Sequence, residues 1–190
     1  MASAKIQDKE KAILAAAIAI FAERGFWNTP TSLISKTAGV ADGTLFNYFT
    51  TKDDLIVGLY LQIKREMAEV LMAGFDVQPT ARDKIYHIWS GYIDWSLANP
   101  QKFKVMSEIH ASYPLSENIK AQSAEPFTRI GLIAQEGIAR GEFYDYPVDY
   151  LAAMMDALSV MTIQHMRANS DTKIDYKAIG FEILWRGVKR

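Results

Sequence analysis

The stretch of sequence that decides the fold covers residues 31–55 and reads TSLISKTAGVADGTLFNYFTTKDDL. It predicts two short helices, the first over residues 31–38 and the second from residue 41 or 42 to residue 49. Gly39 between them can adopt the left-handed backbone conformation that a tight turn requires. Small and apolar side chains can form an inner face between the two helices: Ile34, Ala38, Val40, Leu45 and Phe49. Two short helices joined in this way have the dimensions of a helix-turn-helix.

The segment before this motif also carries helix signals. Over residues 9–23, apolar side chains recur at every third or fourth position, as they do on a helix with one buried face. Gly25 ends that helix. Thr29 and Pro30 then predict the start of the next one, with a hydroxyl cap and a proline at the first helical position.

Longer helices are predicted after the motif. Thr51 and Asp54 resemble a capping box, which opens a helix that continues to about residue 71. Four or five more amphipathic helices follow, near residues 81–98, 101–112, 116–140, 147–169 and 174–188. Strand-like alternation is absent. The sequence therefore predicts an all-α fold of about nine helices, with a three-helix helix-turn-helix domain over residues 1–54 and a larger helical domain over residues 55–190.

Composition limits the class of protein. Of 190 residues, 49% are hydrophobic, which is enough for a substantial core. No run approaches the roughly 18 apolar residues of a membrane span, and the first residues are too polar for a secretory signal. The chain has no cysteine, its three histidines are widely separated, and it contains neither a glycine-rich phosphate loop nor a GxSxG nucleophile. We therefore expect a cytoplasmic protein that is not an enzyme and uses no metal or cofactor.

The charge balance also restricts how the chain could contact DNA. Its net charge of −1 argues against a general nucleic-acid binder, which is usually basic. Residues 1–55 hold six lysines and arginines against six aspartates and glutamates. Any DNA contact must therefore come from a small, well-aimed surface. We expect weak non-specific affinity and binding that is strongly sensitive to salt.

The order of residues in the motif resembles a known family. Ile-x-x-x-Ala-Gly-Val over residues 34–40, Gly-Thr-Leu-Phe-x-Tyr-Phe over residues 43–49 and Lys-x-x-Leu over residues 52–55 are similar to the N-terminal signature of the tetracycline-repressor (TetR) family. The preceding Phe-Ala-Glu-Arg-Gly-Phe over residues 21–26 matches as well, and the resemblance covers roughly residues 10–60. It implies a ligand-responsive DNA-binding transcriptional regulator, most directly a homodimeric repressor that binds a palindromic operator and is released by a small effector.

The resemblance also implies which side chains contact DNA: Thr31, Ser32, Thr44, Phe46, Asn47, Tyr48 and Lys52. Asn47 is the best candidate for reading a base, because a carboxamide can pair bidentately with adenine. Tyr48 and Lys52 would contact phosphates and set the register. The chain departs from the family pattern at Ala41 and Asp42, where serine followed by lysine or arginine is common. Asp42 either caps the second helix in place of Ala41 or accepts a hydrogen bond from a cytosine amino group, and capping is the favoured alternative.

The larger domain is expected to bind the effector and to dimerise. Methionine and aromatic side chains on its helices suit either a core or a pocket for an apolar or aromatic ligand. The lining residues proposed from the resemblance are Trp89, Tyr92, Met106, His110, Phe127 and Met154. The last two helices would form a four-helix interface with a second copy, through Met155, Leu158, Met161, Thr162, His165, Phe181, Leu184 and Val188.

Other functions remain open at this point. An activator could be built on the same fold, because the sign of regulation depends on promoter position. A helical enzyme is disfavoured by the missing catalytic motifs. A helical small-molecule-binding or interaction protein without specific DNA binding would explain the aromatic second half but not the motif over residues 31–55.

Overall fold

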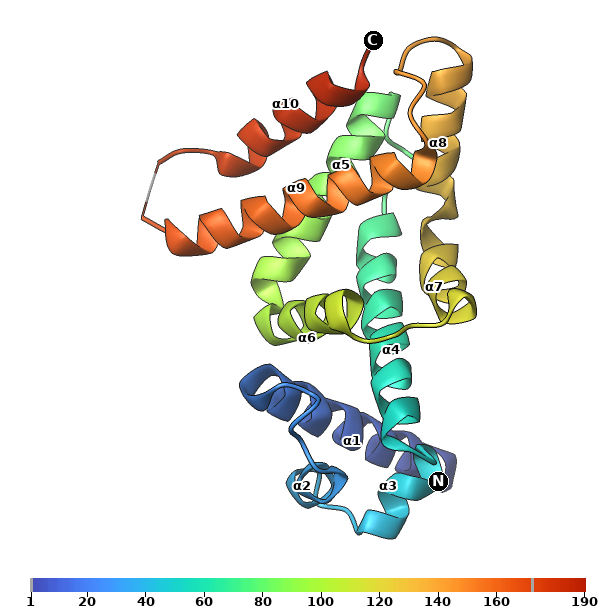
Figure 1. Ribbon diagram of the computed structural model, residues 1–190, viewed down its shortest axis with the longest axis vertical. Helices are drawn as coiled ribbons and strands as arrows, with labels where there is room; N and C mark the ends of the chain where they lie inside the picture. The colour runs from blue at the N-terminus through green and yellow to red at the C-terminus, as the bar shows by residue number, and fades with distance from the viewer. Residues whose placement is uncertain (1, 172) are drawn as a thin grey trace. The chain divides into compact units, whose positions relative to one another are not determined.

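The computed structural model describes residues 2–171 and 173–190, with side chains described from residue 8 onward. These residues form ten α-helices and one 3-10 turn, and no β-strand occurs among them. The elements are α1 (Ala2–Arg24), α2 (Thr31–Thr37), α3 (Asp42–Tyr48), α4 (Lys52–Met72), α5 (Ala81–Ala98), α6 (Pro100–Ser112), α7 (Glu117–Ala124), η1 (Glu125–Phe127), α8 (Thr128–Ala139), α9 (Val148–Ala168) and α10 (Tyr176–Val188) (Figure 1). The predicted all-α fold is confirmed.

Two helices differ from the sequence prediction. The single helix expected over residues 116–140 is divided into α7 and α8 by the 3-10 turn η1, which contains Pro126. Proline lacks the N–H that continues an α-helix, so the break falls at that residue. At the other end of the chain, α1 extends seven residues before residue 9, to Ala2. Those residues lack an apolar period, but alanine, lysine and glutamine among them are good helix formers.

Of two predicted helix caps, the one at the start of α4 is confirmed and the one at the start of α2 is wrong. At α4, the amide of Thr51 donates to the Asp54 carboxylate (2.9 Å) and the amide of Asp54 donates to the Thr51 hydroxyl (3.0 Å), which confirms the capping box. The hydroxyl cap expected at Thr29 is wrong. The Thr29 hydroxyl instead donates to the carbonyl of Gly25 (2.8 Å), and Pro30 occupies the cap position of α2 without a side-chain hydrogen bond.

Residue contacts divide the chain into two compact units. The first unit contains the residues up to Arg65 together with Asn99–Ser123, and the second contains Glu66–Ala98 together with Ala124–Arg190. Helix α6 therefore belongs to the same unit as α1, α2 and α3, although about 50 residues separate it from α3 in the sequence. The expected functional boundary between residues 54 and 55 stays a prediction.

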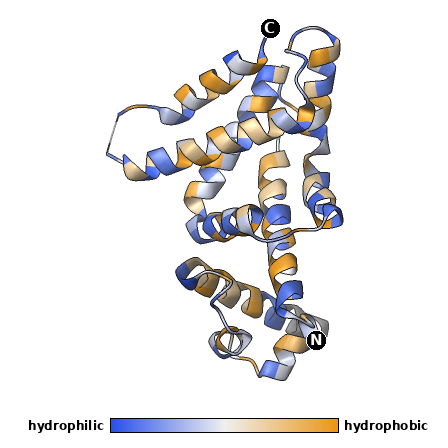
Figure 2. Ribbon diagram, viewed as in Figure 1, coloured by the Kyte–Doolittle hydropathy of each residue, from blue (hydrophilic) through white to orange (hydrophobic). Residues whose placement is uncertain are grey.

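In the first unit, α1 packs against α2, α3 and α6 (Figure 1). The core contains fully buried apolar side chains from four helices: Ile13, Ala17, Phe21, Ile34, Leu45, Leu55 and Leu59. Apolar residues are interspersed with polar ones along α1 (Figure 2), and the buried ones recur at the three- or four-residue spacing of a helix with one buried face. This core holds α2 and α3 in place.

In the second unit, α5 packs against α8, α9 and α10. Trp89 of α5 is fully buried, and its indole N–H donates to the carbonyl of Lys177 at the start of α10 (2.9 Å). Over the described part of the chain, no helix is both long and apolar enough to span a membrane.

Candidate nucleic-acid interface

The geometry of α2 and α3 is that of a helix-turn-helix. Helix α2 ends at Thr37, and Gly39 takes a positive φ of +68°. The turn is closed by backbone hydrogen bonds from the amide of Gly39 to the carbonyl of Lys36 (3.2 Å) and from Val40 to Ser35 (3.0 Å). A left-handed residue at this point strongly favours glycine. The turn therefore depends on Gly39, as the sequence predicts.

The inner face of the motif matches the sequence prediction. Ile34 and Leu45 are fully buried, Phe49 is buried, and Ala38 and Val40 are half-buried. Because these side chains occupy one side of both helices, the other side of α3 is left to solvent. Phe46 and Asn47 lie on that outer side, and 45% of the Phe46 surface is exposed.

Asp42 has a different role from the predicted helix cap. It is the first residue of α3, and the cap position before it is Ala41, which makes no side-chain hydrogen bond. One oxygen of the Asp42 carboxylate instead accepts a hydrogen bond from the hydroxyl of Ser35, a buried residue of α2. The capping prediction is therefore wrong, because the carboxylate links the two helices of the motif. The alternative contact to a cytosine amino group stays a prediction.

All seven predicted DNA contacts belong to the first unit, and none is in its core. Ser32, Phe46 and Asn47 are exposed, whereas Thr31, Thr44, Tyr48 and Lys52 are half-buried. The exposed residues Asp42, Gly43, Phe46 and Asn47 form the solvent side of α3. An exposed phenylalanine beside a carboxamide gives this surface one apolar contact and one bidentate hydrogen-bonding group.

Lys52 is held by a residue that sequence reasoning missed. Its Nζ donates to the backbone carbonyl of Trp27, in the loop between α1 and α2 (3.2 Å). Burial lowers the pKa of Lys52 below its ordinary value, and the charge of Asp53 opposes that shift. Trp27 is 60% exposed. The available signal was a large aromatic residue in the loop between two helices, where it has no periodic pattern to explain it.

The six predicted effector contacts are divided between the two units. Trp89, Tyr92, Phe127 and Met154 are in the second unit, and Met106 and His110 are in the first. The three most deeply placed side chains, Trp89, Tyr92 and Met106, are buried. The hydroxyl of Tyr92 lies 3.5 Å from the Asp156 carboxylate, and Nδ1 of His110 lies 3.5 Å from the Tyr60 hydroxyl. Their assignment to a pocket stays a prediction.

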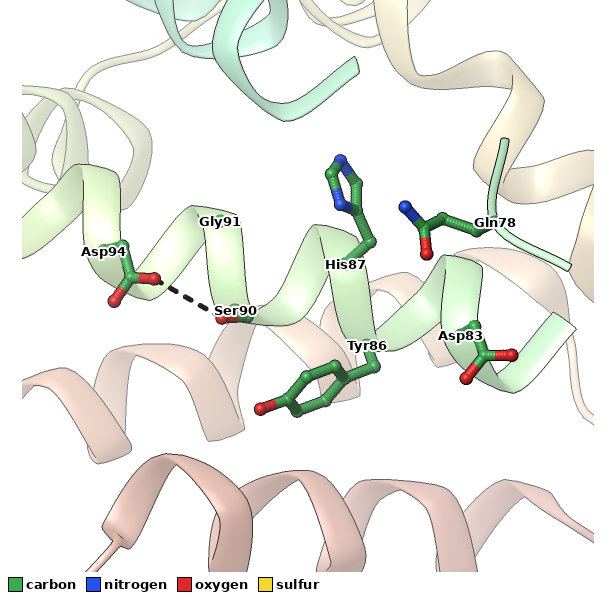
Figure 3. A pocket seen from close by; sticks show the side chains of 7 residues that line it. All are labelled: Gln78, Asp83, Tyr86, His87, Ser90, Gly91 and Asp94. Atoms are coloured by element: carbon green, nitrogen blue, oxygen red, sulfur yellow. Dashed lines mark hydrogen bonds between the residues drawn. The ribbon is translucent and has the colours of Figure 1, made fainter. Parts of the chain in front are cut away.

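A groove of about 410 Å³ lies along α5 in the second unit (Figure 3). Its lining residues are Gln78, Asp83, Tyr86, His87, Ser90, Gly91 and Asp94. Figure 3 shows His87 and Tyr86 pointing to opposite sides of α5. The His87 Nε2 lies 3.1 Å from the Leu71 carbonyl, and Asp94 pairs with Lys177 (2.8 Å). None of the six predicted effector contacts lines this groove.

The eight predicted dimer contacts lie on α9 and α10 but differ in exposure. Met161 and His165 are exposed, and Met155 and Leu158 are half-buried. The other four, Thr162, Phe181, Leu184 and Val188, are buried in the core of the second unit. All eight stay predictions. Sequence reasoning missed two exposed isoleucines on α10, Ile179 (48%) and Ile183 (52%), whose four-residue spacing was the available signal.

A helix-turn-helix with a solvent-facing second helix, followed by further helices, defines a class of DNA-binding transcriptional regulators. Comparison with known proteins agrees with this class. Residues 13–59 match the family model described as bacterial regulatory proteins, tetR family. A curated relative, the fatty acid metabolism regulator protein of Bacillus subtilis (strain 168), is 25% identical over 175 residues, which is 90% of each chain.

Solved structures share the fold over nearly the whole chain. A TetR family transcription regulator from Marinobacter aquaeolei VT8 has a TM-score of 0.90 at 20% identity and covers 100% of both chains. The transcriptional regulator FadR from Bacillus subtilis, in complex with stearoyl-CoA, has a TM-score of 0.72 at 23% identity, covering 93% of this chain and 98% of that one. Residues 13–59 therefore match the DNA-binding domain of the tetR family, and the relatives over the rest of the chain support a TetR family transcriptional regulator.

Proposed function

We propose that this chain is a homodimeric repressor that binds a palindromic operator and releases it when a small, largely apolar effector binds. The observation that carries the proposal is the outer side of α3, where Phe46 and Asn47 are exposed while Leu45 anchors the helix in the core. A short helix that buries one side and presents polar and apolar groups on the other can enter a major groove.

Each predicted contact has a chemical role in this proposal. The carboxamide of Asn47 pairs with an adenine, the Phe46 ring contacts a thymine methyl group, and Thr44 contributes to base specificity beside them. Tyr48 and Lys52 contact phosphates and fix the register of α3, and Thr31 and Ser32 contact a phosphate or a base near the groove wall. Because the surface holds few cations, sequence-specific contacts must supply a large share of the affinity.

The homodimer follows from the length of α3. One helix of seven residues reads too few base pairs to select a site, whereas two copies about one DNA turn apart read a palindrome. The apolar side chains exposed on α9 and α10, Met161, Ile179 and Ile183, support an interface there. Isolated exposed apolar residues are common, but three large ones on two neighbouring helices favour a covered surface.

For the effector, we propose a long-chain acyl compound. The buried aromatic and methionine side chains of the predicted pocket suit an apolar chain. The curated relative is named for fatty acid metabolism, and a structural neighbour holds stearoyl-CoA. The effector would act through a difference in its affinity for the DNA-binding and released arrangements of the dimer.

The DNA-binding part is tested by fluorescence anisotropy against duplexes tiling the DNA upstream of the gene, with excess random competitor. The wild type should bind one fragment tightly, and Asn47→Ala should lose that preference while retaining its fold. Gln135→Ala, which removes an exposed carboxamide from α8, is the matched control and should bind as the wild type does. Equal binding by Asn47→Ala and the wild type would refute base reading by α3.

The effector part is tested separately, by adding acyl-CoA esters of increasing chain length to the bound complex, with free coenzyme A as the control. Long chains should release the operator and free coenzyme A should not. If saturating long-chain ester leaves the operator affinity unchanged, the effector class is wrong and the proposal of DNA binding stands.

A further inference from the structure

Tyr113 is the residue that follows α6, and its ring contacts the loop between α1 and α2. The ring centroid lies 5.9 Å from that of Phe26, at 74°, and 5.9 Å from that of Trp27, at 31°. Phe26 and Trp27 are themselves 4.9 Å apart. Phe26 is buried, so the three rings attach the exposed Trp27 to the core of the first unit.

The hydroxyl of Tyr113 reaches a second element of the same unit. The carboxylate of Asp53, in the first turn of α4, acts on the pKa of this hydroxyl through a side-chain hydrogen-bonding contribution. Burial, together with this hydrogen bond and the charges of Asp53 and Asp54, raises the pKa of Tyr113 to about 12. The hydroxyl is therefore protonated at neutral pH and able to donate.

Two of the residues that interact with Tyr113, Trp27 and Asp53, also interact with Lys52. The Lys52 ammonium donates to the carbonyl of Trp27 (3.2 Å), and the charge of Asp53 acts on its pKa. Tyr113 therefore interacts with both elements that lie beside Lys52: the loop between α1 and α2, and the first turn of α4.

Helix α6, which directly precedes Tyr113, is packed tightly into the first unit. Val105 and Ile109 of α6 are fully buried, and α6 packs against α1. The Nζ of Lys104 donates to the carbonyl of Ala22 (2.7 Å), one of the carbonyls in the last turn of α1 that have no partner within the helix. Tyr113 is thus supported from α6 while it contacts the loop and α4.

We propose that Tyr113 is a positioning residue for DNA binding, which fixes Trp27 and Asp53 around Lys52 and so directs the Lys52 ammonium toward an operator phosphate. The inference rests on the proposed function, in which Lys52 contacts a phosphate. It adds a residue outside the helix-turn-helix, more than 60 positions after α3 in the sequence, on which a DNA contact depends. Without Tyr113, Lys52 would lose its fixed direction although it would still be present.

The test is the salt dependence of operator binding, which counts phosphate contacts and which a purely structural role would not change. Lys52→Ala should weaken binding by about tenfold and lower the slope of log K against log salt by about 2, one phosphate from each protomer. Tyr113→Ala should lower the slope by a similar amount. The double variant should bind no more weakly than Lys52→Ala alone, because Tyr113 acts through Lys52.

Two further variants keep the test decisive if Tyr113→Ala folds poorly. Tyr113→Phe keeps the ring contacts and removes only the hydroxyl on which Asp53 acts, so it should give a smaller loss of affinity in the same direction. Tyr144→Ala, at an exposed tyrosine of the second unit, should leave the slope unchanged.

The possible results distinguish a failure of the positioning role of Tyr113 from a failure of the proposed operator binding. A wild type that binds no duplex would overturn both. A wild type that binds, with Tyr113→Ala and Tyr113→Phe showing an unchanged slope or losses that add to that of Lys52→Ala, would overturn the positioning role alone.

Discussion

Gly180 of α10 lies where a side chain has no room. A Cβ added there would be 2.7 Å from the hydroxyl oxygen of Thr162 and 2.7 Å from Cζ2 of the buried Trp89. Gly180→Ala should therefore lower the free energy of unfolding by about 1–3 kcal/mol, the usual cost of overpacking a core. Urea unfolding followed by circular dichroism measures the change.

Gly187 provides the matched control for Gly180, since it lies in the same helix and a Cβ there would meet nothing within 4 Å. Gly187→Ala should be neutral or raise the stability by up to about 1 kcal/mol, the difference in helix propensity. If both variants lose the same stability, helix propensity or unfolded-state effects, rather than the contact with Trp89, would be responsible.

Asp42 places a negative charge at the start of α3, and the Ser35 hydrogen bond can survive its removal. Asn at this position still offers an oxygen to the Ser35 hydroxyl, so Asp42→Asn should fold normally. The loss of repulsion from a phosphate is about 1 kcal/mol per charge pair near water, with one pair from each protomer of the dimer, and should tighten binding to random duplex by roughly thirtyfold. Anisotropy at fixed salt checks this.

A matched charge change at an exposed site of the second unit, Asp149→Asn, should leave the affinity for random duplex almost unchanged. An equal gain from Asp149→Asn would mean that net charge, rather than the position of Asp42, sets non-specific binding. Weaker binding to the operator by Asp42→Asn would instead support the contact between Asp42 and a cytosine.

Tyr113 predicts a loss of stability in alkaline solution. Its pKa in the folded chain is about 12, above the value near 10 of a free tyrosine. A group whose pKa is raised by folding contributes stability that is complete below the unfolded value and is lost as the pH rises through the folded one. Between about pH 10 and 12, the urea midpoint of the wild type should therefore fall more steeply than that of Tyr113→Phe; parallel curves would contradict the assignment.

Residue positions on the inner face of the motif were predictable, whereas side-chain partners were not. Ile34 and Leu45 follow a helical period of apolar residues, which can be identified from the sequence alone. The hydrogen bond between Ser35 and Asp42 depends on how two helices cross, and so does the contact between Lys52 and Trp27. Neither pair has a sequence spacing that identifies it.

At the scale of helices, α10 carries the prediction about assembly. Ile179 and Ile183 lie one turn apart and each is about half exposed. If these isoleucines pack against α10 of a second protomer, Ile183→Glu should place a carboxylate in an apolar interface. Sedimentation velocity should then show a monomer instead of a dimer. Val77→Glu, at an 80% exposed position outside α9 and α10, should leave the oligomeric state unchanged.

Helix boundaries show why some elements were predicted more accurately than others. The limits of α5 agree with the prediction because a threonine cap precedes it and Asn99 and Pro100 follow it. The division between α7 and α8 was missed, because apolar residues continue across Pro126 and one proline within a long pattern can either kink a helix or end it. The competing signals at that point have comparable strength.

At the scale of the whole chain, the sequence predicts the fold class but not the grouping of its helices. Helical periods and the motif over residues 31–55 were sufficient for an all-α regulator. That α6 belongs with α1, α2 and α3 depends on Lys104, Tyr113 and the buried Val105, whose partners lie more than 80 residues earlier in two cases. Long-range contacts of this kind leave no local pattern.

The distribution of the four tryptophans gives the protein an optical reporter. Trp27 is 60% exposed in the first unit, while Trp89 and Trp95 are buried and Trp185 is half-buried in the second. Iodide ions, which cannot enter a protein core, should quench the fluorescence of Trp27 first and leave most of the remaining emission. The Trp27 carbonyl accepts from Lys52 beside the proposed DNA surface, so bound operator should shield Trp27 from iodide. The tryptophan fluorescence of unlabelled protein would then show whether DNA is bound.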